Sequence, residues 1–171
     1  MTADVIRRAA SRFVERIDVG SAPIDTMAVA KAVGLPVIRE SLRPDITGAL
    51  VSTPNGPAAV LNARQPANRQ RVLLAHLIGH LQLGHRLPTI VHVEGRFEAY
   101  REPRRYSAVE QLEFEANVFA GSLLMPTRLV KKAVARLAHE TLGDDDIQQL
   151  ATQFGVSVQG MTLRLAGAKL L

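Results

Sequence analysis

The stretch HLIGH, residues 76–80, places two histidines four residues apart. In a helix this spacing brings His76 and His80 onto one face, where two imidazoles can bind one metal ion. Enzymes with the HExxH zinc motif have a glutamate after the first histidine, and that glutamate acts as the general base. Here the equivalent residue is Leu77. The stretch therefore predicts a helix with a metal site that lacks this base.

A third protein ligand is expected, because a catalytic zinc site holds three protein ligands and leaves its fourth position to water. We choose Glu113, on a helix predicted over 107–124, as this ligand. Asn117 follows one turn later on the same face and is expected to support the site through a hydrogen bond. Glu110 lies one turn before Glu113 and could also approach the ion. Glu115 lies half a turn away and is expected to face solvent.

The histidine spacing also fits a simpler interpretation, in which His76 and His80 are buried residues that pack on an apolar helix face. Pairs at this spacing often arise by chance, so the pair alone is a weak signal. His85 and His92 add little to the pattern. His85 follows Gly84, where the end of a helix favours an imidazole on electrostatic grounds. Both interpretations are open at the level of spacing.

The composition is ordinary for a soluble globular protein, with 47% apolar and 22% charged residues in a chain of 171. The chain has no cysteine, which excludes disulfides and any cysteine-ligated metal. The basic segment 1–12 is not followed by the apolar region of a signal peptide, and no apolar run is long enough to span a membrane. We therefore predict a cytoplasmic protein with no membrane partner.

The chain is basic, with a formal net charge of +5 and a pI of about 10.2. Such a charge permits binding to nucleic acid or to an acidic partner. In the densest positive cluster, however, glutamates alternate with the arginines, and no platform of aromatic and basic residues accompanies it. We therefore expect a solvated loop here and no direct nucleic-acid binding. The residues concerned are Arg96, Arg101, Arg104 and Arg105, with Glu98 and Glu102 between them.

Hydrophobic periodicity and turn residues predict an α+β fold in which a hairpin precedes most of the helices. Helices are expected over 4–17, 23–32, 66–83, 107–124, 127–139, 144–154 and 158–170. Strands are expected over 35–39, 48–52, 58–62 and 89–93. We predict a single domain over 1–171, with N-terminal helices in 1–35, the sheet and metal-site helices in 36–126, and C-terminal helices in 127–171.

Short motifs occur in a recognisable order along most of the chain. They include Pro23-Ile24-Asp25, Val33-Gly34-Leu35-Pro36-Val37, Gly48-Ala49-Leu50, Ala59-Val60-Leu61-Asn62, Arg69-Gln70-Arg71, Leu74-Ala75-His76, Glu113-Phe114-Glu115-Ala116-Asn117, Leu123-Leu124-Met125-Pro126 and Phe154-Gly155-Val156-Ser157. Together they resemble the ImmA/IrrE family of metallo-endopeptidases, from about residue 4 to residue 165. The resemblance implies a zincin-like core, in which a small sheet lies beside an active-site helix.

The resemblance also implies ligands and a partner. By position, His76, His80 and Glu113 correspond to the family's zinc ligands, and Zn²⁺ is the expected cofactor. The family's substrates, where understood, are helix-turn-helix repressors of phages or mobile elements, or related regulators. The expected partner is therefore a repressor-type protein of this kind.

Leu77 is the main departure from the family pattern, because it occupies the position of the catalytic glutamate. Leucine cannot transfer a proton, and general acid–base catalysis typically contributes roughly 10²–10⁴-fold in rate. In one reading the chain is a natural pseudoenzyme. In a second, Leu77 is an engineered replacement made to trap a substrate. In a third, another carboxylate such as Glu110 serves as the base.

Three classes of function remain for comparison. The first is a zinc endopeptidase that acts on a regulator, and the second is a protein of the same fold that binds a regulator without cutting it. The third is a DNA-binding protein that would use the helices near 23–35 or 150–165. Neither of these segments has the basic recognition face that a DNA-binding helix needs. Leu77 favours the second class, with peptide hydrolysis absent or greatly reduced.

Overall fold

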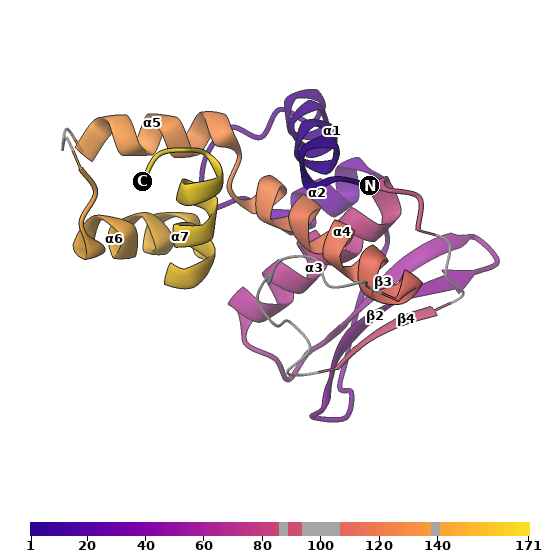
Figure 1. The fold of residues 1–171 in the computed structure, drawn as a ribbon. Coiled ribbons are helices and arrows are strands. Elements are labelled where there is room, and N and C mark those ends of the chain that lie inside the picture. Colours follow the sequence, from indigo (N-terminus) through magenta and orange to yellow (C-terminus); the bar gives the residue numbers. More distant parts are fainter. Residues whose placement is uncertain (86–88, 94–106, 138–140) are drawn as a thin grey trace. The chain divides into compact units, whose positions relative to one another are not determined.

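The computed structural model describes residues 1–85, 89–93, 107–137 and 141–171. These residues form seven helices and one four-stranded sheet (Figure 1). The chain divides into two compact units. Unit 1 contains Met1 and Asp25–Ala120, and unit 2 contains Thr2–Ile24 and Gly121–Leu171. The predicted α+β class is confirmed, and the single-domain boundaries remain a prediction.

The sheet of unit 1 is built around the predicted hairpin. Its strands are β1 (Val37–Glu40), β2 (Ile46–Thr53), β3 (Gly56–Asn62) and β4 (Thr89–Val93), in the order β1-β3-β2-β4. The hairpin strands β2 and β3 pair antiparallel, β1 joins β3 in parallel, and β4 joins β2 antiparallel. The turn between β2 and β3 uses Gly56 at a φ of 110°, a backbone conformation that glycine adopts without steric cost.

An irregularity in β2 sets the position of β4. Ile46 pairs with Val93 and Gly48 pairs with His92, so Thr47 is left between the two pairs as a bulge. The Thr47 hydroxyl donates a hydrogen bond of 3.1 Å to the backbone carbonyl of His92. Bulges of this kind re-aim neighbouring side chains. The bulge therefore holds His92 at a defined place beside β2.

The helices of unit 1 are α2 (Thr26–Ala32), α3 (Ala67–Gln82) and the first part of α4 (Ala108–Leu124), whose last turn belongs to unit 2. Helix α3 lies against α2, β2 and β3. Every residue from Leu73 to His80 is buried, because these neighbours and α4 surround that part of the helix. The predicted capping box of α4 is confirmed, since Ser107 and Glu110 each bond the other's backbone N–H.

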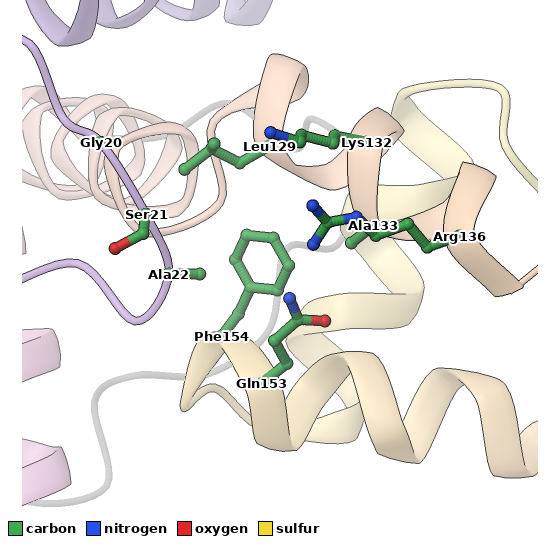
Figure 2. Close-up of a pocket in the computed structure, with 9 residues that line it drawn as sticks. All are labelled: Gly20, Ser21, Ala22, Leu129, Lys132, Ala133, Arg136, Gln153 and Phe154. Atoms are coloured by element: carbon green, nitrogen blue, oxygen red, sulfur yellow. The ribbon is translucent and has the colours of Figure 1, made fainter.

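The regular elements that the structure describes in unit 2 are helices, namely α1 (Ala3–Arg16), α5 (Thr127–Leu137), α6 (Asp144–Phe154) and α7 (Val158–Gly167), besides the end of α4. Arg164 of α7 donates hydrogen bonds to the Met125 carbonyl and the Thr127 hydroxyl, which fixes α7 to the start of α5. A pocket of about 260 Å³ lies within this unit, with Lys132, Arg136 and Phe154 in its lining (Figure 2). None of the described residues that line this pocket is a histidine or a carboxylate, so it offers no donors of the kind that the expected zinc site uses.

Some predictions fall on residues outside the described ranges. The basic cluster at 96–105 is among them, as are the last residues predicted for the helix over 127–139. In the part of the chain that the structure describes, no helix combines the length and apolarity needed to cross a bilayer.

Gly79 offers a direct test of the packing between α3 and α4. A Cβ atom at this position would lie 2.9 Å from the Ala116 backbone oxygen and 3.3 Å from the Phe119 Cβ. We predict that Gly79→Ala lowers the free energy of unfolding by about 1–3 kcal/mol, because overpacking forces backbone atoms apart. Chemical denaturation would measure this change.

The matched control is Gly121→Ala, in α4, where an added Cβ meets nothing within 4 Å. Alanine there should leave the stability unchanged or raise it by about 0.5–1 kcal/mol, as expected for a helix interior. Equal effects of the two substitutions would contradict the close helix contact at Gly79.

Candidate metal centre

Two imidazoles from α3 form the base of the candidate metal centre. His76 and His80 are both fully buried, and their Nε2 atoms lie 2.9 Å apart. The four-residue spacing places them on the same helix face, as predicted. Their burial alone would also fit the simpler interpretation of two packed core histidines, so the other donors around them decide between the two.

Glu113 of α4 faces this pair of histidines. Its Oε2 lies 3.3 Å from His76 Nε2, and its Oε1 lies 3.3 Å from His80 Nε2. The side chain is 32% exposed, whereas both imidazoles are inaccessible to solvent. Helices α3 and α4 approach closely at Gly79, opposite Ala116. Because Glu113 lies one turn before Ala116 in α4, its carboxylate reaches both rings.

His92 of β4 lies beside Glu113 and His76, although it adds little to the sequence pattern. Its Nδ1 is 3.7 Å from Glu113 Oε2, and its ring centroid is 4.6 Å from that of His76. One donor atom from each of His76, His80, His92 and Glu113 can be chosen so that all four lie within 4.8 Å of one another. The described residues therefore bring together a group that could hold a metal ion.

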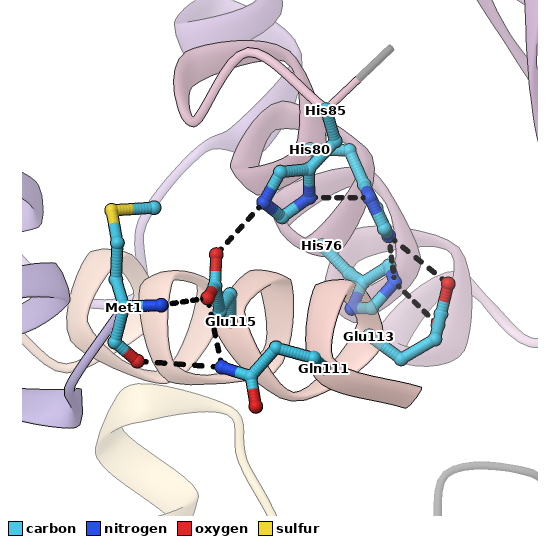
Figure 3. A network of polar contacts seen from close by, with 7 residues as sticks. All are labelled: Met1, His76, His80, His85, Gln111, Glu113 and Glu115. Atoms are coloured by element: carbon cyan, nitrogen blue, oxygen red, sulfur yellow. Dashed lines mark hydrogen bonds and ion pairs between the residues drawn. The ribbon is translucent and has the colours of Figure 1, made fainter. Parts of the chain in front are cut away.

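The outer nitrogens of both α3 histidines are hydrogen-bonded. Asn117 Oδ1 lies 2.7 Å from His76 Nδ1, as expected from its position one turn after Glu113. Because an amide oxygen only accepts, His76 Nδ1 carries the proton and Nε2 presents its lone pair to the centre. His80 Nδ1 contacts His85 Nδ1 at 2.9 Å, and His85 Nε2 contacts Glu115 Oε2 at 3.1 Å (Figure 3). A chain of donors from His80 through His85 to the Glu115 carboxylate gives His80 the same tautomer.

The prediction that Glu115 faces solvent is wrong. Glu115 is only 4% exposed and, besides His85, it accepts hydrogen bonds from the Met1 amino group and from Gln111 (Figure 3). It does point away from Glu113, as the helical spacing requires, but that side of α4 is covered by His85 and Met1. The sequence offers no local signal for this cover, because both residues come from other segments.

The electrostatics of the cluster favour the protonation states that bind metals. Burial lowers the pKa of His76, and burial together with the neighbouring His76 lowers the pKa of His92 from 6.5 to about 3. Burial by itself would raise the pKa of Glu113, but the neighbouring imidazoles of His76 and His80 hold it well below its usual range. These shifts favour a neutral imidazole at His76 and His92 and an anionic carboxylate at Glu113, which are the ligating forms.

The donor set also fits zinc in size. With zinc–ligand distances of about 2.0–2.1 Å, neighbouring donors of a tetrahedron lie about 3.3–3.4 Å apart. The separations of 2.9 Å between the α3 imidazoles and 3.3 Å from each of them to Glu113 lie near this value. When bound at such donors, zinc acts as a Lewis acid, and the side chains described above would hold and orient it.

Comparison with known proteins identifies a family for this chain. Residues 30–166 match the family model described as the IrrE N-terminal-like domain, peptidase M78. The chain belongs to this family. The resemblance to ImmA/IrrE proteins is thereby confirmed, and the sheet, α3 and the helical C-terminal region are consistent with a zincin-like domain of this family.

A solved structure of a Mycobacterium tuberculosis transcriptional regulator is also similar to this chain, with a TM-score of 0.63 and 18% sequence identity. The match covers 95% of this chain but only 46% of the regulator, so the chain spans less than half of that protein. At this identity the likeness concerns the fold. A search of curated proteins finds no significant match.

Within this member of the IrrE-like family, Leu77 stands where the catalytic glutamate is expected. Its side chain is fully buried, and a leucine offers no atom that can accept or donate a proton. Glu110, considered above as a substitute base, is exposed, and its carboxylate accepts a hydrogen bond from the Ser107 backbone N–H. It is not part of the group of donors that lie together.

Asn117 provides a test of the metal centre that leaves all four donor side chains in place. We predict that Asn117→Ala lowers the affinity for Zn²⁺ by roughly 10–100-fold, the usual effect of losing a hydrogen bond to a ligand imidazole. Competition with a chromophoric chelator would measure the affinity. Val109→Ala is the matched control, because Val109 is on the same helix and 56% exposed. Identical affinities in the two variants would argue against a metal bound at His76.

Proposed function

We propose that this chain is a zinc-binding protein with a peptidase fold that binds a transcriptional regulator, of the helix-turn-helix repressor type, with little or no hydrolysis of it. The observation that carries the proposal is the combination of buried metal donors with Leu77. His76, His80 and Glu113 supply the zinc ligands. The next position after His76 supplies no base.

The proposal of metal binding is supported by the free-energy cost of the alternative, in which His76 and His80 merely pack in the core. Burying polar groups in an apolar core costs free energy. Two fully buried imidazoles whose Nε2 atoms face each other and a carboxylate are therefore unfavourable as ordinary core packing. The same arrangement is well suited to a shared cation, which would satisfy the lone pairs of both rings and the charge of Glu113. Asn117 and His85 fix the ring orientations that such a cation requires.

The proposal of impaired hydrolysis is supported by the contacts that the carboxylates on α4 already make. Glu113 is committed to the metal, Glu115 is bonded to His85 and Gln111, and Glu110 caps its own helix. None of the three is free to take a proton from a metal-bound water. Without a general base we expect a rate roughly 10²–10⁴-fold below that of a complete site.

The proposed partner is supported by the family and by the fold shared with a transcriptional regulator. A protein that keeps the fold and the metal donors of a peptidase, but not its base, retains the means to bind a substrate-like protein. The partner in this proposal is a helix-turn-helix repressor encoded beside the gene, and the consequence of binding would be relief of repression without proteolysis.

We predict that protein purified without chelator forms a stable complex with that repressor and leaves it intact. Size-exclusion chromatography would detect the complex, and mass spectrometry after prolonged incubation would detect any cleaved fragment. Fragments that appear only in the absence of chelator would show an active endopeptidase with another base. The absence of any complex at micromolar concentrations would remove the proposed partner.

A further inference from the structure

His92 reaches the metal centre from the sheet, whereas the other three donors come from α3 and α4. It pairs with Gly48 of β2, directly beside the bulge at Thr47. The hydrogen bond from the Thr47 hydroxyl fixes the His92 backbone, and both residues are less than 9% exposed. The position of this imidazole is therefore determined by the sheet and is independent of the spacing within α3.

The His92 ring contacts both histidines of α3. Its centroid lies 4.6 Å from that of His76, with the rings nearly perpendicular at 87°, and 5.8 Å from that of His80. Its Nδ1 is 3.7 Å from Glu113 Oε2, a separation close to the roughly 3.3–3.4 Å edge of a tetrahedral zinc site. A donor atom of His92 thus lies within 4.8 Å of donor atoms of the three residues discussed above.

The number of protein donors decides what a zinc site can do. Catalytic sites use three protein ligands and keep the fourth position for water or substrate, whereas sites with four protein ligands are closed and structural. A closed site has no metal-bound water to activate. It would lack the nucleophile of peptide hydrolysis, just as Leu77 leaves it without the base.

We propose that His92 is the fourth protein ligand of the bound zinc, which closes the site and joins β4 to α3 and α4. This inference rests on the zinc binding proposed above. The loss of the glutamate at Leu77 then accompanies a change of role, from an ion that activates water to an ion that holds an edge strand against two helices. The donors are three imidazoles and one carboxylate.

X-ray absorption spectroscopy on the zinc-loaded wild-type protein tests the proposal without any substitution. The expected result is four light-atom ligands with the scattering of three imidazoles, and a cobalt(II)-substituted sample should give the intense visible absorption of a four-coordinate ion. Two imidazoles together with bound water would overturn the proposal.

The variant His92→Ala provides the second test. A ligand should contribute at least as much affinity as an outer hydrogen bond, so zinc binding should weaken by roughly 10–100-fold or more. The cobalt spectrum should change as water enters the vacated position, and added imidazole should restore it. Unchanged affinity together with an unchanged spectrum would overturn the proposal.

Two controls separate a ligand from a merely structural residue. Val91→Ala changes an exposed neighbour on the same strand and should leave both affinity and spectrum as in the wild type. His85→Ala removes the partner of His80 and should weaken binding while the cobalt spectrum still reports four-coordination. If the wild-type protein binds no zinc at all, the proposed function itself fails. If it binds zinc through two imidazoles, only the role of His92 fails.

Discussion

The close approach of α3 and α4 is the constraint on which the site depends. Gly79 lies between the two histidines of α3, and its missing side chain lets the backbone of Ala116 come within van der Waals distance. Ala116 is one turn from Glu113, so this contact fixes how far the carboxylate is from His76 and His80. Any larger residue at position 79 would move the donors apart. The candidate metal centre thus depends on this packing as much as on the identity of the ligands.

A substantial part of the fold and of the site follows from sequence reasoning. Helical spacing brings His76 and His80 together, and it also places Glu113 and Asn117 on one face of α4, where the structure has them. The hairpin follows from alternating apolar residues around a turn with glycine. These features are local, since each depends on residues within two or three helical turns or on a single turn.

The parts that sequence reasoning missed depend on contacts between distant segments. The place of His92 is set by the pairing of β4 with β2 and by the bulge at Thr47, and neither the register nor the bulge can be read from periodicity. The burial of Glu115 likewise depends on His85 and Met1, which come from other parts of unit 1. Local sequence patterns therefore do not predict the register of a strand that joins the edge of a sheet after a long connection.

In the proposed function, Leu77 and the buried donors together separate metal binding from catalysis. Zinc ligation needs only lone pairs in the correct orientation, and the cluster supplies these with hydrogen-bonded rings. Hydrolysis also needs a proton acceptor, and position 77 provides only an apolar side chain packed in the core.

The most direct test of the proposed zinc binding is a calorimetric titration of chelator-treated protein with Zn²⁺. We expect one ion bound per chain, with binding abolished in the double variant His76→Ala/His80→Ala, whereas a wild-type protein that takes up no zinc would contradict the proposed metal centre.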